Sequence, residues 1–403
     1  MLTRRTFALA VTIACSLVPR QLHAQPSMPP PTSPPRSLWR LPGAAVGTPT
    51  HDADTVYVLD KNREVIALAA DDGILKWRSG TGVTSSDAIF GLTTSGTNLV
   101  LSGDLVIAGD WDIVAFDKRS GARRWTFQAD GGDGPGLFLG AARDDTVYAG
   151  SVTGHVYAVD AGTGRLRWAT RVADRPMASV FAPEIAGARV VVGYSVYDNP
   201  NTGGLAALDA STGRLAWNTA FPKPSEPWRH VNRAGGPVLA GDLVFGSAGD
   251  GNVYAFDVET GAIRWTLPRL DGPFAGYITA TDLDHRALVR TGRLIVAGSA
   301  TGKIVAYDIE TRALAWEHDA GPWGSTSFTL AADEALVYVP FFGGFVLALD
   351  VATGDERWRV GGFTVGMIWA PDPAGDRVYV AGSRGGVYAF DTQAPTPATK
   401  GRP

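Results

Sequence analysis

A nine-residue phrase recurs along this 403-residue chain, and it constrains the fold more than any other feature. The phrase reads DAGTGRLRW at residues 160–168, and altered copies occupy residues 69–77, 117–125, 209–217, 257–265, 308–316 and 350–358. A phrase used this often serves a structural purpose that every repeat shares. We therefore expect its Asp, Gly and Trp to build the fold and not to carry chemistry.

Each of these residue types has a physical reason to recur. Aspartate accepts backbone N–H bonds within its own turn, and glycine supplies the positive φ that a tight turn needs. Tryptophan is a large flat side chain that fills the gap between neighbouring repeats. Arg312 replaces the glycine in one copy, so we expect that turn to be strained or differently shaped.

Two short apolar runs precede each copy and complete a repeating unit. TVYAG (146–150) and HVYAV (155–159) have the composition of strands joined by a hairpin turn. A looser apolar segment, such as GGPVLAG (235–241), gives a fourth strand. Units of four antiparallel strands, recurring every 38 to 51 residues, predict an all-β fold, the β-propeller. Blades stacked around an axis cover the apolar faces that one sheet alone would expose.

The tryptophans give the number of blades. Seven phrases end in Trp, and an eighth unit at 375–395 stops before its last strand. The segment SLWRL (37–41) carries a Trp with no unit in front of it. We therefore expect eight blades in one domain over residues 37–394, with the N-terminal strand completing the last blade. The predicted blade tryptophans are Trp39, Trp77, Trp125, Trp168, Trp217, Trp265, Trp316 and Trp358.

The termini lie outside this domain. Residues 1–24 have paired arginines before a short apolar run and resemble a twin-arginine export signal. A Pro-rich linker (25–36) follows, and residues 395–403 are expected to be a disordered tail. These features predict a periplasmic or otherwise extracytoplasmic protein, with a lipid anchor through Cys15 as the alternative. The mature chain would contain no transmembrane segment and no cysteine.

The frame VYAxDxxTGxxxW, preceded by V[YF]xGS, resembles the pyrroloquinoline-quinone (PQQ) repeat over residues 37–394. That family includes quinoprotein alcohol dehydrogenases and the outer-membrane-protein assembly factor BamB, which this chain resembles more in size and style. The dehydrogenases are longer and carry an adjacent Cys–Cys disulfide and a calcium ligand set, neither of which we find here. The resemblance implies a non-catalytic binding or assembly scaffold in the cell envelope. The alternatives are a PQQ- or metal-dependent oxidoreductase and a glycan-binding propeller.

Function is then expected in the insertions between the repeated phrases. Three of the four long insertions belong to blades four to six, and we expect them to share one face. Aromatic and basic side chains of this kind dominate binding surfaces, although they could instead cap the core beneath their own loops. The candidate binding residues are Tyr197, Trp228, Arg229, His230, Phe274, Tyr277 and His285.

No catalytic motif or metal site stands out from this sequence. The predicted partner is another envelope protein, or a glycan in the alternative reading. A net charge of −4 without any basic run argues against nucleic acid. We expect a monomer without a bound cofactor, PQQ with calcium being the alternative.

Overall fold

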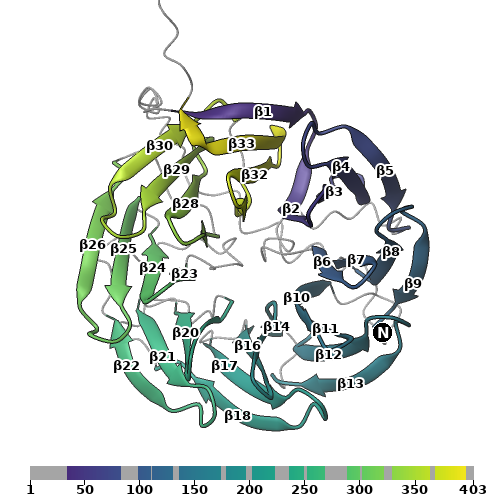
Figure 1. The fold of residues 1–403 in the computed structure, drawn as a ribbon. Coiled ribbons are helices and arrows are strands. Elements are labelled where there is room, and N and C mark those ends of the chain that lie inside the picture. The colour runs from purple at the N-terminus through teal and green to yellow at the C-terminus, as the bar shows by residue number, and fades with distance from the viewer. Residues whose placement is uncertain are drawn as a thin grey trace, which may run out of the picture.

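The protein is described from a computed structural model. The structure describes residues 34–82, 99–109, 111–129, 136–173, 178–196, 202–222, 236–248, 252–267, 288–299, 302–321, 329–363 and 368–395. Within these ranges the regular structure consists of β-strands, and no helix is long and apolar enough to cross a membrane. The strands form eight antiparallel sheets, which are arranged as the blades of a ring around a central axis (Figure 1).

In blades one to four, the chain runs from the axis to the rim. Their strands are β2 (Ala45–His51), β3 (Thr55–Asp60), β4 (Glu64–Ala69) and β5 (Leu75–Gly80); β6 (Leu99–Ser102), β7 (Leu105–Gly109), β8 (Ile113–Asp117) and β9 (Arg123–Phe127); β10 (Leu137–Arg143), β11 (Thr146–Ser151), β12 (His155–Asp160) and β13 (Leu166–Arg171); and β14 (Ala178–Val180), β15 (Glu184–Ala186), β16 (Arg189–Val196), β17 (Thr202–Asp209) and β18 (Leu215–Ala220). In the fourth blade the innermost strand is split, because β14 and β15 pair with successive halves of β16.

Blades five to seven repeat the same order. Their strands are β19 (Val238–Ala240), β20 (Leu243–Ser247), β21 (Val253–Asp257) and β22 (Ile263–Leu267); β23 (Leu288–Thr291), β24 (Leu294–Gly298), β25 (Lys303–Asp308) and β26 (Leu314–Asp319); and β27 (Ala331–Ala332), β28 (Leu336–Phe341), β29 (Phe345–Asp350) and β30 (Glu356–Val360). The all-β, eight-bladed fold expected from the repeats is confirmed.

The eighth blade joins the two ends of the chain. It contains β31 (Asp372–Ala374), β32 (Arg377–Gly382) and β33 (Gly386–Pro395), and its outermost strand is β1 (Pro35–Leu41). In Figure 1 the purple β1 lies beside the yellow β33. Trp39 is opposite Ala389 in this antiparallel ladder, so the predicted closure by the N-terminal strand is confirmed.

Two boundaries differ slightly from the sequence-based expectation. β1 begins at Pro35, inside the expected linker, because the side chain of Arg36 reaches Asp391 of β33 at 2.7 Å. β33 continues to Pro395, one residue into the expected tail. Both shifts lengthen the ladder that closes the ring.

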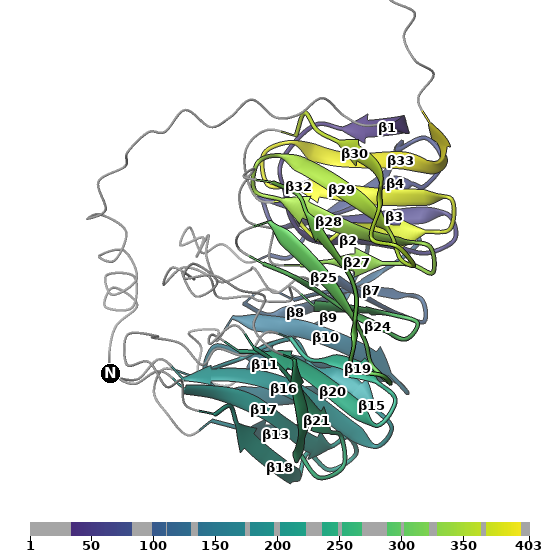
Figure 2. The same cartoon turned by 90° about the vertical axis from the view of Figure 1, so that its left-hand side faces the viewer.

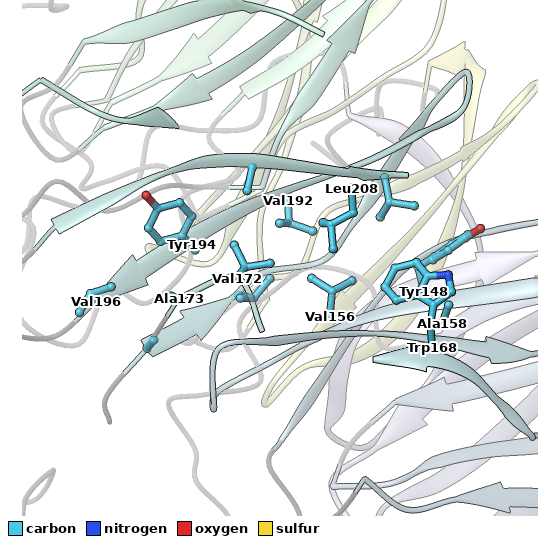
Figure 3. Packing of buried hydrophobic residues seen from close by; sticks show 14 residues of the cluster. Tyr148, Val156, Ala158, Trp168, Val172, Ala173, Val192, Tyr194, Val196 and Leu208 are labelled. Atoms are coloured by element: carbon cyan, nitrogen blue, oxygen red, sulfur yellow. The ribbon is translucent and has the colours of Figure 1, made fainter. Parts of the chain in front are cut away.

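The hydrophobic core is divided into layers between blades. Each of the eight clusters of buried side chains joins two neighbouring blades. Figure 3 shows the layer between the third and fourth blades, where Trp168 and Val156 face Val192 and Leu208. Because every sheet has two apolar faces, the ring is stable only when each blade has a neighbour on both sides.

Candidate functional site

In six of the seven repeated phrases the turn is held by the aspartate at the first position, which the copy at 69–77 lacks. In the third blade, Asp160 Oδ1 accepts hydrogen bonds from the Thr163 amide at 2.9 Å and the Thr163 hydroxyl at 2.7 Å. The backbone N–H of Gly164, at φ 73°, donates to the Asp160 carbonyl. Arg167 donates to the second carboxylate oxygen, and this bond, with those from Thr163, lowers the pKa of Asp160 to about 2. The aspartate is therefore an ionised turn residue whose oxygens are already occupied.

The turn that lacks glycine keeps the same shape. Arg312 adopts a φ of 61°, and its backbone N–H donates to the Asp308 carbonyl as the glycines do elsewhere. A left-handed backbone conformation is unfavourable for a residue other than glycine. The expected strain is therefore present, although the turn keeps its shape. The Arg312 guanidinium lies 5.6 Å from the ring centroid of Trp265 in the preceding blade.

The blade tryptophans contact the turn of the next blade. A Cβ atom placed on Gly213 would lie 2.5 Å from Cδ2 of Trp168, so the indole ring rests directly on that glycine. The indole N–H also donates to a backbone carbonyl of the same turn. This bond joins Trp39 to Ala70, Trp77 to Lys118, Trp125 to Ala161, Trp168 to Ala210, Trp217 to Val258 and Trp316 to Val351.

Trp358 is an exception because the eighth blade has no such turn. In that blade β33 runs on to Pro395 and pairs with β1, so the repeated phrase is missing there. The Trp358 side chain is buried, yet its indole N–H has no hydrogen-bond partner among the residues that the structure describes. The neighbouring Arg359 is also buried and pairs with Glu356 at 2.7 Å, with its guanidinium 5.4 Å from the Phe345 ring centroid.

This difference predicts unequal effects of the same substitution at two blades. Trp217→Phe removes the bond to Val258 and leaves a buried carbonyl unpaired, whereas Trp358→Phe removes a donor that already lacks a partner. We expect Trp217→Phe to lower the free energy of unfolding by about 1 kcal/mol more than Trp358→Phe does. Urea unfolding of both variants measures this difference, and equal losses would contradict it.

A histidine–aspartate pair spans the seam between the first and last blades. His51 of β2 lies 2.6 Å from Asp372 of β31, and its ring contacts Tyr379 at 5.6 Å. The hydrogen bond with Asp372 raises the pKa of His51, and Asp52 adds to this effect. Burial raises the pKa of the Asp372 carboxyl, and the bond with His51 opposes that shift. The pair joins the two ends of the ring beside the closing strand.

The raised pKa of His51 makes this seam sensitive to pH. Its stabilising contribution is complete below the ordinary value of 6.5 and is lost as pH rises through the higher folded-state value. We expect the wild type to exceed His51→Gln in stability by about 1 kcal/mol at pH 6, and by less at pH 9. His155 provides the control, because burial and Arg171 lower its pKa. The difference in stability between the wild type and His155→Gln should not decline between pH 6 and pH 9.

Four strand ends in the fourth and fifth blades lie on one face of the ring. Ala220, the last residue of β18, is opposite Gly204, which lies near the start of β17 and near the β16–β17 hairpin. Leu267, at the end of β22, is opposite Val253 in the same way. Figure 2 shows the ring from its side, with the strands of each blade running between two faces. The insertions assigned to binding therefore leave the described strands at a common face.

The seven candidate binding residues themselves lie outside the described part of the chain, so their assignment stays a prediction. The other histidines considered are structural. His155 lies 3.2 Å from Thr153 in a hairpin turn, and His318 lies 3.0 Å from the Gly354 carbonyl of the next blade. Sequence reasoning did not find the His51–Asp372 contact, because 321 positions separate the two residues.

PQQ with calcium would require a set of metal ligands. Among the described residues, no group of three or more His, Cys, Asp or Glu residues could hold a metal ion. The turn carboxylates of blades two to seven accept bonds from their own turns, and Asp160 and Asp257 also pair with an arginine.

Together, the ring of eight blades and the shared Asp–Gly–Trp contacts define a PQQ-type repeat propeller. The family described as outer membrane protein assembly factor BamB matches residues 35–125, 109–269, 205–363 and 300–395, and the chain belongs to this family.

Individual relatives match smaller parts of the chain. BamB of Bordetella pertussis is 32% identical over 170 residues, which are 38% of this chain and 40% of that protein. The 1-butanol dehydrogenase (cytochrome c) of Thauera butanivorans is 30% identical over 109 residues, 24% of this chain and 16% of the dehydrogenase. The crystal structure of BamB from Moraxella catarrhalis superimposes with a TM-score of 0.66 at 16% identity, covering 89% of this chain and 99% of that one. This last similarity concerns the fold alone.

Proposed function

We propose that this protein is an exported, non-catalytic propeller that acts as a binding or assembly scaffold in the cell envelope. The observation that carries the proposal is the use of the repeated residues. The Asp, Gly and Trp that recur in the phrases make contacts within and between blades. The family match to an outer membrane protein assembly factor supports this role and an envelope location. The twin-arginine-like segment and the predicted periplasmic location are part of the same proposal.

The proposed binding surface is the face from which the long insertions of the fourth to sixth blades leave. Trp228 and Phe274 are the aromatic residues with which we expect a protein partner to make its main contacts. Aromatic anchors on a rigid scaffold are typical of interfaces that bind without chemistry. The ring supplies the rigidity, because each blade is held by its two neighbours.

Loss of the gene in its native host tests the assembly role. We expect fewer folded β-barrel proteins in the outer membrane, measured as the heat-modifiable fraction on gels. The wild-type chain should restore them, whereas a chain with Trp228→Ala and Phe274→Ala should not. Leu314→Ala, at an exposed position on β26, is the control that should restore them fully. Unchanged barrel levels in the deletion strain would reject the role.

The second candidate is a PQQ-dependent oxidoreductase, and the similarity to the Thauera butanivorans dehydrogenase favours it. The purified protein with PQQ and Ca²⁺ separates the two candidates. The scaffold proposal predicts no saturable change in melting temperature and no reduction of an electron-accepting dye by a primary alcohol. A saturable change together with dye reduction would support the oxidoreductase.

A further inference from the structure

The outer rim of the ring consists of edge strands, one for each blade. An outermost strand presents unpaired N–H and C=O groups to solvent and can pair with another strand. Natural proteins protect such edges with charged side chains, lysine and arginine above all. The outermost strands of this protein are β5, β9, β13, β18, β22, β26, β30 and β1.

Only one of these eight described edge strands lacks a charged residue. β18 has the sequence LAWNTA, whereas each of the other seven contains at least one Lys, Arg, Asp or Glu. Part of the difference lies at the position before the tryptophan, although this position is uncharged in β26 and β1 too. Arg124, Arg167 and Arg264 stand there in three blades and pair with the aspartate of their own turn. Ala216 takes this position in β18.

The side chains of β18 also leave room for a second strand. Leu215, Ala216, Asn218 and Ala220 are exposed, with Leu215 at 40%. Two of these are alanines, so a neighbouring backbone could approach closely. Figure 1 shows β18 on the convex outside of the ring, where another rigid body can reach it.

The polar side chains of β18 already have partners inside the protein. Asn218 donates to the Val172 carbonyl at 3.1 Å, and Thr219 donates to the Gly261 carbonyl at 2.9 Å. The indole N–H of Trp217 donates to Val258. Pairing through the free edge would therefore engage the backbone of β18 without leaving these side chains unsatisfied.

The absence of charge on this edge indicates which strand fits it. In an antiparallel pair of two identical strands, each residue lies near a copy of itself or of its neighbours. Such a pair made by β9, β13 or β22 would bring arginines together, and one made by β26 would bring Glu317 and Asp319 together. Like charges placed opposite each other are destabilising. β18 has no charged side chain, so it can pair with its own copy without this cost.

We propose that two copies of this protein associate through antiparallel pairing of β18 with β18. The two fourth blades then form one continuous sheet across a two-fold axis through the middle of the strand. One short strand per copy gives a weak association, which would be populated at micromolar to submillimolar protein concentrations. This differs from the monomer expected from the sequence, and it is independent of the proposed binding face.

Light scattering of the full chain over about 1 to 200 µM tests the proposal. The wild type should approach twice the monomer mass as the concentration rises. Ala216→Arg restores the residue type found in other blades and should pair with Asp209, so we expect it to stay folded and monomeric. Ala315→Arg in β26 is the matched control and should dimerise as the wild type does. Should Ala216→Arg fail to fold, Ala220→Lys on the same edge should also give a monomer.

Three results would overturn the proposal. The wild type could remain monomeric throughout, which would leave the edge to a strand of another protein. The dimer could persist in both Ala216→Arg and Ala220→Lys, which would place the interface elsewhere. Ala315→Arg could abolish the dimer as strongly as Ala216→Arg, which would show that added charge acts without regard to the edge.

Discussion

Trp39→Ala should lower the free energy of unfolding by about 3–5 kcal/mol, the range for truncation of a large buried aromatic side chain. Trp39 is only 8% exposed, and its ring covers Gly73 in the first blade. Its indole N–H donates to the Ala70 carbonyl, and the ring stacks on Tyr379 at 5.9 Å. The substitution removes all three contacts at the point where the two chain ends close the ring.

The same substitution at another blade provides the control. Trp265 is only half-buried and contacts Arg312 where Trp39 contacts a glycine. Because less apolar surface is removed from water there, Trp265→Ala should cost about half as much as Trp39→Ala. Urea unfolding measures both losses. If Trp39→Ala lowers the free energy of unfolding no more than Trp265→Ala does, the closing blade contributes less to stability than the structure indicates.

Gly150→Ala should be nearly as damaging, although it adds only one methyl group. A Cβ atom at this position in β11 would lie 2.3 Å from the Val180 carbonyl oxygen and 2.5 Å from that of Phe181. Both atoms belong to the backbone of the fourth blade, so no side chain can turn aside. We expect a loss of about 3 kcal/mol, at the upper end of the range for inserting volume into a packed core.

Gly162→Ala separates this steric effect from a general cost of replacing glycine. The nearest atom to its added Cβ would be Asp160 Oδ1 at 3.6 Å, an ordinary contact, and neither Gly150 nor Gly162 has a positive φ. Gly162→Ala should therefore change the free energy of unfolding by less than about 0.5 kcal/mol. Thermal and urea unfolding of the two variants give the comparison, and similar losses would argue against a close approach of the blades.

The parts of the fold that were predicted correctly depend on neighbours in sequence. The Asp160 turn, the positive φ of Gly164 and the strands around them are set within a few residues. Their repetition then gives the number of blades, and the unmatched Trp39 gives the closure. Pattern reasoning succeeds here because the same local structure recurs in most of the blades.

The parts that were missed depend on contacts between blades. Gly150 lies in an ordinary strand pattern, and only the distance to Val180 shows why a larger residue is excluded. His51 and Asp372 meet because the ring closes, and neither residue has a local signal of pairing. The free N–H of Trp358 likewise follows from the missing turn of the last blade. The repeat pattern also could not predict the positions of the candidate binding residues, because the insertions that carry them belong to no repeat.

Amide hydrogen exchange of the full chain tests the central claim, that the N-terminal strand completes the last blade. The structure predicts slow exchange at alternate amides of residues 35–41, matched by slow exchange across residues 386–395, because the two strands form one ladder. Deleting residues 1–41 should make the amides of β33 that face β1 exchange rapidly, whereas those that face β32 keep their partners. Rapid exchange at 35–41 beside a protected 386–395 in the intact protein would contradict closure by this strand.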